Sequence, residues 1–171
     1  MKVRGWIREG DTAACGATVA EGDPTFSSHG KHLAFDGATM SCAKRCHVVA
    51  GSNNATLPDG HRKVVHGDAT SNGCPLISTL NDVHGIGVGD GDTVATGFVQ
   101  DAGGNWQPGK FDDRYVLRGV GNDAPLANTA YAIERESGAV EHGITDAQGR
   151  THLLQQTLER EHVRLYVEDI E

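Results

Sequence analysis

The chain has 171 residues, of which 22% are charged and 37% hydrophobic, values that are ordinary for one or two small globular domains. Its formal net charge is −8 at pH 7, and residues 111–171 contain twelve acidic residues against six arginines. Nucleic-acid-binding domains concentrate Lys and Arg on one face, so this balance argues against a nucleic-acid partner. No apolar run approaches the ~20 residues that a membrane-spanning helix requires.

Glycine is unusually frequent, with 23 in the chain, and the only short stretch with helical promise is 153–160. Glycine favours turns and weakens helices, so strands joined by tight turns should dominate. The sequence therefore predicts an all-β fold.

The four cysteines lie in the first half of the chain, at Cys15, Cys42, Cys46 and Cys74. Three of them end a similar phrase, which runs over 10–15, 37–42 and 67–74 and begins with glycine each time. A shift of thirty positions also sets Gly30 on Gly60 and Gly37 on Gly67, which indicates two stacked copies of one unit.

Four cysteines that a repeat brings together can form disulfides, hold a metal or remain buried free thiols. No apolar leader precedes them, so we expect folding in a reducing cytoplasm, where lasting disulfides are rare. Zinc takes four thiolate or imidazole ligands, and the short loop from Cys42 to Cys46 suits a chelate. A closed structural zinc site is therefore favoured. Such a site has no open position for water, so it predicts no catalysis.

The spaced motifs of the first half resemble those of the PAAR-repeat proteins. They are Gly10-Asp11-Thr12-x-x-Cys15-Gly16, then Val19-x-Glu21-Gly22-Asp23-Pro24-Thr25-Phe26, the loop Cys42 to Cys46, and Gly67-Asp68 leading to Cys74 and Leu76-Ile77. The resemblance implies a squat β-pyramid with zinc near its apex, which caps the trimeric VgrG spike of type VI secretion.

The resemblance also implies which residues bind the metal. Its positions fall on Cys15, Cys42, either Cys46 or His47, and Cys74. We favour Cys46, because thiolate binds zinc well and His47 can then point outward. Asn72-Gly73 looks like an insertion before Cys74, which leaves the local geometry there open.

The remaining polar residues of this half have simpler interpretations. Six histidines, His29, His32, His47, His61, His66 and His84, fall mainly at expected turns and strand ends, and a second metal or catalytic cluster is the alternative. Asp11 and Asp68 each follow a glycine, which favours turns in which the carboxylate binds nearby backbone.

We expect three parts: a spike-tip domain over 1–88, a linker rich in Gly and Asp over 89–110, and an extension over 111–171. Trp106 should hold the linker to one domain, and Gly89-Asp90-Gly91-Asp92 has too little of an EF-hand pattern to predict calcium. Alternation such as Val163, Leu165 and Val167 predicts a small antiparallel β-sandwich in the extension.

Two phrases of the extension resemble the transthyretin-like domains found on type VI spike proteins. They are Pro125-Leu126-Ala127-Asn128-Thr129-x-Tyr131-x-Ile133 and Gly143-x-Thr145 to Thr151. The resemblance implies an adaptor that docks a toxic effector or its chaperone. The protein would then be cytoplasmic before firing and afterwards secreted or delivered into a target cell.

Two rival functions stay open. In the first, the extension is itself an enzymatic toxin that uses His142, His152 and His162 with Asp146 or Glu141, although no supporting catalytic motif is present. In the second, the same tip belongs to a phage-tail-like injection device. A non-enzymatic spike tip and adaptor is the preferred interpretation.

Overall fold

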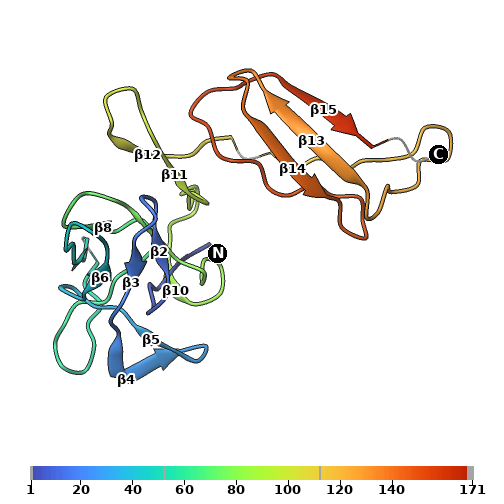
Figure 1. The fold of residues 1–171 in the computed structure, drawn as a ribbon. Coiled ribbons are helices and arrows are strands. Elements are labelled where there is room, and N and C mark those ends of the chain that lie inside the picture. The colour runs from blue at the N-terminus through green and yellow to red at the C-terminus, as the bar shows by residue number, and fades with distance from the viewer. Residues whose placement is uncertain (1, 52, 112, 169–171) are drawn as a thin grey trace. The chain divides into compact units, whose positions relative to one another are not determined.

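The computed structural model describes residues 2–51, 53–111 and 113–168. Every regular element in these ranges is a strand, which confirms the prediction of an all-β fold. The chain divides into two compact units, Met1–Pro108 and Gly109–Glu171, each of which has its own core (Figure 1).

Short strands make up the N-terminal unit. They are β1 (Val3–Gly5), β2 (Thr12–Ala13), β3 (Thr18–Val19), β4 (Asp23–Ser28), β5 (Lys31–Leu33), β6 (Met40–Ser41), β7 (Val48–Val49), β8 (Ala69–Thr70), β9 (Leu76–Ile77), β10 (Gly85–Gly87), β11 (Phe98–Gln100) and β12 (Trp106–Pro108). One sheet has four strands in the order β6-β3-β2-β9, and the others are the pairs β1-β10, β4-β5, β7-β8 and β11-β12. All pairings are antiparallel.

The repeat is present three times rather than twice. Each copy starts at a glycine with positive φ, namely Gly10, Gly37 and Gly67 at 84°, 96° and 85°. Nine to eleven residues after each glycine, the chain comes back beside it, and the glycine N–H donates to the carbonyl of an apolar residue there. The pairs, in chain order, end at Val19 (2.9 Å), Val48 (2.8 Å) and Leu76 (2.9 Å). The N–H of each apolar residue donates back to the residue after the glycine. The three copies thus share one backbone pattern.

These returning residues form the centre of the unit. Val19, Val48 and Leu76 are at most 1% exposed, and so are Ile7, Ala34 and Val64 at the bases of the three copies. The N–H of Ile7 donates to Val64 and that of Ala34 donates to Ile7, both at 2.9 Å. Burial of these aliphatic side chains at ~25 cal/mol per Å² supplies most of the stabilisation that this small core provides.

The expected long strands are interrupted. Residues 17–26 divide into β3 and β4, because β3 pairs with β2 and β6 whereas β4 pairs with β5. The expected hairpins are confirmed: His29 and Gly30 turn between β4 and β5 with φ of 48° and 78°, and Gly60 turns at 91° beside the bridge from Thr56 to Arg62.

The C-terminal unit contains β13 (Ala130–Arg135), β14 (Val140–Ile144) and β15 (Val163–Val167) in an antiparallel sheet ordered β14-β13-β15. One face of this sheet packs Tyr131 and Ile133 against Leu154. Isolated bridges, including Val116 to Arg150, form the opposing layer, as a small β-sandwich requires.

Residues 153–160, the stretch with helical promise, contain no helix. Leu154 is 6% exposed and lies in the core, and Thr157 bridges to Phe111. Tertiary pairing of this segment outweighs its weak local preference. In the ranges that the structure describes, no helix has the length and apolar character needed to cross a membrane.

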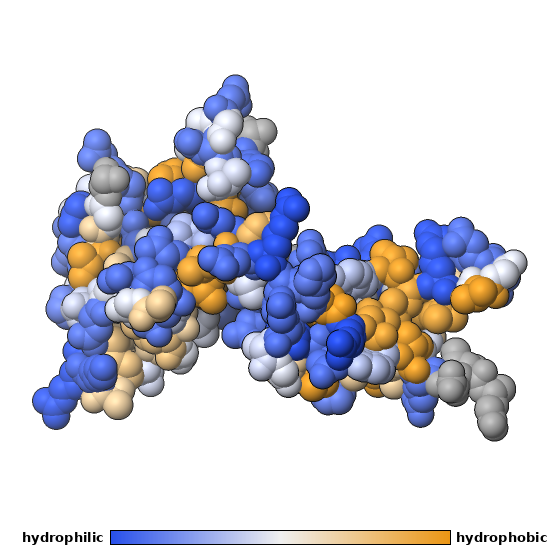
Figure 2. Space-filling model, turned by 90° about the horizontal axis from the view of Figure 1, so that it is seen from above, coloured by the Kyte–Doolittle hydropathy of each residue, from blue (hydrophilic) through white to orange (hydrophobic). Residues whose placement is uncertain are grey.

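Large hydrophobic side chains are more exposed on the C-terminal unit than on the N-terminal one. Figure 2 shows hydrophobic atoms on its surface among polar ones. The large hydrophobic residues that are exposed in the described part of this unit are Val116, Val120, Val140, Ile144, Leu153, Tyr166 and Val167. Its surface is therefore more apolar in places than that of the N-terminal unit.

Candidate functional site

The three repeats deliver their cysteines to one place. A cavity of about 1010 Å³ is lined by Cys15, Cys42, Cys46 and Cys74 together with the turn glycine Gly67. Cys15, Cys42 and Cys74 each end one repeat, and Cys46 follows a short loop after the second. All four sequence-predicted cysteines therefore face the same space.

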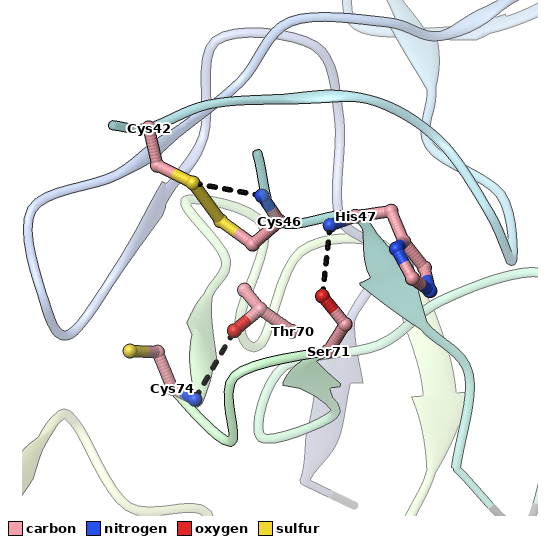
Figure 3. Close-up of a disulfide and its surroundings, with 6 residues drawn as sticks. All are labelled: Cys42, Cys46, His47, Thr70, Ser71 and Cys74. Atoms are coloured by element: carbon pink, nitrogen blue, oxygen red, sulfur yellow. Dashed lines mark hydrogen bonds between the residues drawn. A yellow bond between two sulfur atoms is a disulfide. The ribbon is translucent and has the colours of Figure 1, made fainter. Parts of the chain in front are cut away.

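The sulfurs do not all have the same state. Cys42 and Cys46 form a disulfide (Figure 3). Cys15 and Cys74 are free, the first exposed and the second buried. The backbone N–H of Cys46 also donates to Sγ of Cys42 at 3.0 Å, and Arg45 within the loop takes a positive φ of 50°. The loop is therefore folded tightly enough to bring its two sulfurs together.

The two free thiols interact with each other. Burial raises the pKa of the Cys74 thiol, and a hydrogen bond with Cys15 raises it further. Thr70 fixes the backbone here, because its Oγ1 accepts a hydrogen bond from the N–H of Cys74 at 3.1 Å. Lys44 also lines the cavity and acts in the opposite direction on the Cys74 pKa, since a cation favours thiolate.

His47 lies apart from this cavity, whereas Cys46 lines it. The backbone N–H of His47 donates to Ser71 Oγ at 3.2 Å, its side chain is exposed, and its ring points away from the sulfurs in Figure 3. The structure thus presents the Cys46 side chain, and not that of His47, to the other cysteines.

The donor chemistry of the cavity fits a soft metal ion once the disulfide is reduced. Among the described residues, no three His, Cys, Asp or Glu side chains are arranged to hold a metal as they stand, and two of the four sulfurs are joined in the disulfide. Reduction leaves four thiols on one cavity, which is the ligand set of a closed structural zinc site.

The repeated Gly-Asp pairs are turns, as expected. Asp11 Oδ2 accepts from the N–H of Arg8 at 2.9 Å, and Asp68 Oδ2 accepts from that of Val65 at 3.0 Å. Both carboxylates are buried, and burial raises the pKa of Asp68. These acids therefore hold the bases of two repeats, away from the cysteine cavity.

The histidines of this unit are dispersed. Ser28 Oγ contacts Nδ1 of both His84 and His29, at 2.7 and 3.0 Å, while His61 pairs with Asp59 at 2.8 Å on the surface. His66 is the buried one, at 2% exposure. Within the described residues they form no group of three that could hold a metal.

The stretch proposed as a linker, 89–110, contains ordered structure. It includes the hairpin of β11 and β12, and Trp106 on β12 packs against the repeat core. The boundary between the compact units falls between Pro108 and Gly109. Trp106 thus holds this segment to the N-terminal unit, because its indole finds apolar contacts there.

In the C-terminal unit, one predicted histidine, His152, lies in a partly buried polar network. His152 contacts Glu141 through Nε2 and the Tyr131 hydroxyl through Nδ1, both at 2.6 Å. Arg135, whose side chain is 7% exposed, pairs with Glu141 and Glu161. Burial acts to raise the pKa of Glu141, but the hydrogen bonds from His152 and Arg135 outweigh it and the pKa is lowered.

The other members of the enzymatic alternative do not join this network. Asp146 makes turn hydrogen bonds to the backbone of Gln148 and Arg150, and the side chains of His142 and His162 are exposed. Sequence patterns gave no signal for Arg135 and pointed to Tyr131 only as part of a strand, because the network joins residues from distant segments. Its satisfied hydrogen bonds are those of a structural ion cluster.

The part of the chain that contains the repeats and their cysteines matches a known family model. Residues 9–78 match the family model of the PAAR motif. The matched range contains all four cysteines and all three repeats. The match covers less than half of the chain and supports a PAAR-repeat protein. Searches of curated proteins and of solved structures gave no match.

Proposed function

We propose that the protein is the non-enzymatic tip of a type VI secretion spike, which caps a trimeric VgrG and carries a toxic effector through its C-terminal extension. The observation that carries the first part is the PAAR match over 9–78, together with three backbone repeats that each end in a cysteine. A rigid wedge of this kind needs no turnover, since its role is to be pushed through a membrane.

The metal is proposed to be zinc, held by Cys15, Cys42, Cys46 and Cys74. The four side chains line one cavity, and their thiolate chemistry is that of a closed zinc site. When bound, the ion would join the cysteines of the three repeats and stabilise the fold, and it would have no catalytic role. The chain's own part is to place one cysteine at the end of each repeat and to satisfy the local backbone through Thr70 and Ser71.

The three-part division is kept as a proposal, with the tip domain over 1–88 and the extension over 111–171. Between them, the β11–β12 segment would belong to the tip in folding terms, since Trp106 packs on its core. The extension is proposed to be transthyretin-like, which agrees with its antiparallel sheet and alternating burial.

An adaptor role for the extension is supported by its surface. The face of the sheet opposite the core carries Val140, Ile144 and Tyr166, which are 49%, 69% and 52% exposed. Among the described strands, β14 and β15 each have β13 as their one neighbour in this sheet, so they form its two edges. Open edges and apolar faces are the surfaces by which sheets accept partner segments.

Delivery would begin in the cytoplasm and end outside the producing cell or inside a target cell. Two alternatives differ in their outcome. If the extension were itself the toxin, its expression alone would harm a susceptible cell. If the tip belonged to a phage-tail-like device, it would fail to bind a VgrG spike while still folding with metal.

One experiment separates these roles. The full chain and a variant that lacks 109–171 are each tested for co-purification with the cognate VgrG and for effector export. We expect VgrG binding by both and effector loss only from the truncated variant. Loss of VgrG binding on truncation would count against the adaptor, and failure of the full chain to bind any VgrG would count against the spike tip.

A further inference from the structure

The β11–β12 hairpin lies against the cysteine cavity. Gln100 at the end of β11 and Trp106 at the start of β12 are paired with each other, and both line the same cavity as the four cysteines. Gly104 and Asn105, from the turn between the strands, line it as well. The cavity therefore has one wall that does not come from the repeats.

The base of the hairpin is fixed to the third repeat. The ring of Phe98 lies 5.3 Å from that of buried His66, centroid to centroid. Its Cζ would be 3.5 Å from a Cβ placed on Gly67, the turn glycine that also lines the cavity. Trp106 adds a second attachment by packing against the repeat core.

The tip of the hairpin is ordered by its own hydrogen bonds. Asp101 Oδ1 accepts from the N–H groups of Gly103 and Asn105, each at 2.9 Å, and the N–H of Asp101 donates to the carbonyl of Asn105 at 2.9 Å. These bonds to Asn105 and Gly103 lower the pKa of Asp101. A preformed turn costs little entropy when it covers a site.

We propose that the β11–β12 hairpin is a cap over the four-cysteine metal centre, with Trp106 as the residue that shields the sulfurs. This inference rests on the proposed zinc site. Loss of zinc from thiolates, and oxidation of those thiolates, both require a reagent to reach sulfur or metal, and the apolar shell around a site controls that access. The cap would keep the metal bound while the tip is pushed through a membrane.

The test measures zinc release. The reduced, zinc-loaded full chain is mixed with an excess of a colour-forming chelator, and the release rate is compared for wild type, Trp106→Ala and Trp106→Phe. We expect one zinc per chain in all three, release at least about tenfold faster from Trp106→Ala, and a near wild-type rate from Trp106→Phe. Gln107→Ala is the matched control, because Gln107 is exposed on the same strand and does not line the cavity.

Two results would overturn parts of this account separately. Equal release from wild type and Trp106→Ala, with unchanged zinc content, would exclude the cap. Wild type without zinc would exclude the proposed metal. In that case the cap is tested on the reduced, metal-free chain by the rate at which the buried thiol of Cys74 reacts with a thiol reagent: faster reaction in Trp106→Ala supports the cap, and equal rates reject it.

Discussion

Nδ1 of His66 accepts a hydrogen bond from the backbone N–H of Ser78 at 3.1 Å. A nitrogen that accepts carries no proton, so this contact holds the buried imidazole in its neutral form. Burial lowers the pKa of His66, and the backbone at Ala95 offsets only part of that effect. The third repeat is thereby coupled to pH.

The pH dependence of stability follows from this coupling. In the unfolded chain the pKa of this histidine is about 6.5, and in the folded protein it is lower. At pH values between the two pKa values, the unfolded state therefore binds more protons than the folded state. Stabilisation by neutral His66 is complete above about pH 6.5 and is lost as pH falls towards the folded pKa. We therefore expect the N-terminal unit to unfold at a lower urea concentration at about pH 5.5 than at about pH 7.5. Tryptophan fluorescence measures this midpoint.

A matched pair of variants tests the assignment. His66→Asn should be less stable at pH 7.5 but should show a smaller change with pH. His61→Asn should keep the fall and make it slightly steeper, because Asp59 raises the pKa of exposed His61 and that group adds stability as the pH falls. An unchanged pH profile in His66→Asn would show that other groups govern the acid response.

The buried Arg135 should be essential to the C-terminal unit. Arg135→Ala leaves Glu141 and Glu161 partly buried without their cation, which should cost about 3 kcal/mol of unfolding free energy. Arg164→Ala is the control, since its side chain is 79% exposed and 3.9 Å from Glu134, and it should change stability by less than about 1 kcal/mol.

The measurement can be confined to one unit. All three tyrosines, Tyr115, Tyr131 and Tyr166, lie in the C-terminal unit, and both tryptophans, Trp6 and Trp106, lie in the N-terminal one. Near-ultraviolet circular dichroism of tyrosine therefore follows the change. Equal effects of Arg135→Ala and Arg164→Ala would mean that the buried pairs carry no special weight.

Metal removal should affect the two units differently. A chelator with a thiol reductant should lower the thermal midpoint of the N-terminal unit by several degrees, because metal binding to a site absent from the unfolded chain is folding free energy. The C-terminal tyrosine signal should not move, since its core is separate. A shift of both transitions, or of neither, would contradict a structural metal confined to the repeats.

The central aliphatic residues give a further prediction. Val48 is fully buried in the second repeat, so Val48→Ala should cost about 1 to 3 kcal/mol through lost contacts and a residual cavity. Val49, the next residue on β7, is 37% exposed, and Val49→Ala should cost well under half as much. A larger cost at Val49 would place the core on the other face of β7.

The sequence predicted which cysteines lie together better than it predicted their surroundings or the disulfide between Cys42 and Cys46. Cys15, Cys42, Cys46 and Cys74 could be singled out because repeated phrases place them in register, and they do line one cavity. The first repeat, at Gly10, was not counted as a copy because Gly10 and Gly37 are spaced differently from Gly37 and Gly67. The common backbone pattern appears only in hydrogen bonds that cross between distant segments.

Other features depend on contacts that local patterns do not encode. Trp106 and Phe98 lie in a stretch whose glycines and aspartates are typical of a linker, yet their rings pack on the repeats. The contact of His152 with Glu141 and Tyr131 likewise joins three separate segments. Alternation of buried residues on β13 and β15 was readable because strand period alone determines it.

The most direct test of the metal centre is the zinc content of the purified, reduced full chain, measured with single substitutions to serine at Cys15, Cys42, Cys46 and Cys74 and with His47→Ala. The account predicts about one zinc per chain in wild type and in His47→Ala, and a marked loss in each cysteine variant. No metal in the reduced wild type, or full retention when Cys46 is replaced and loss when His47 is replaced, would contradict it.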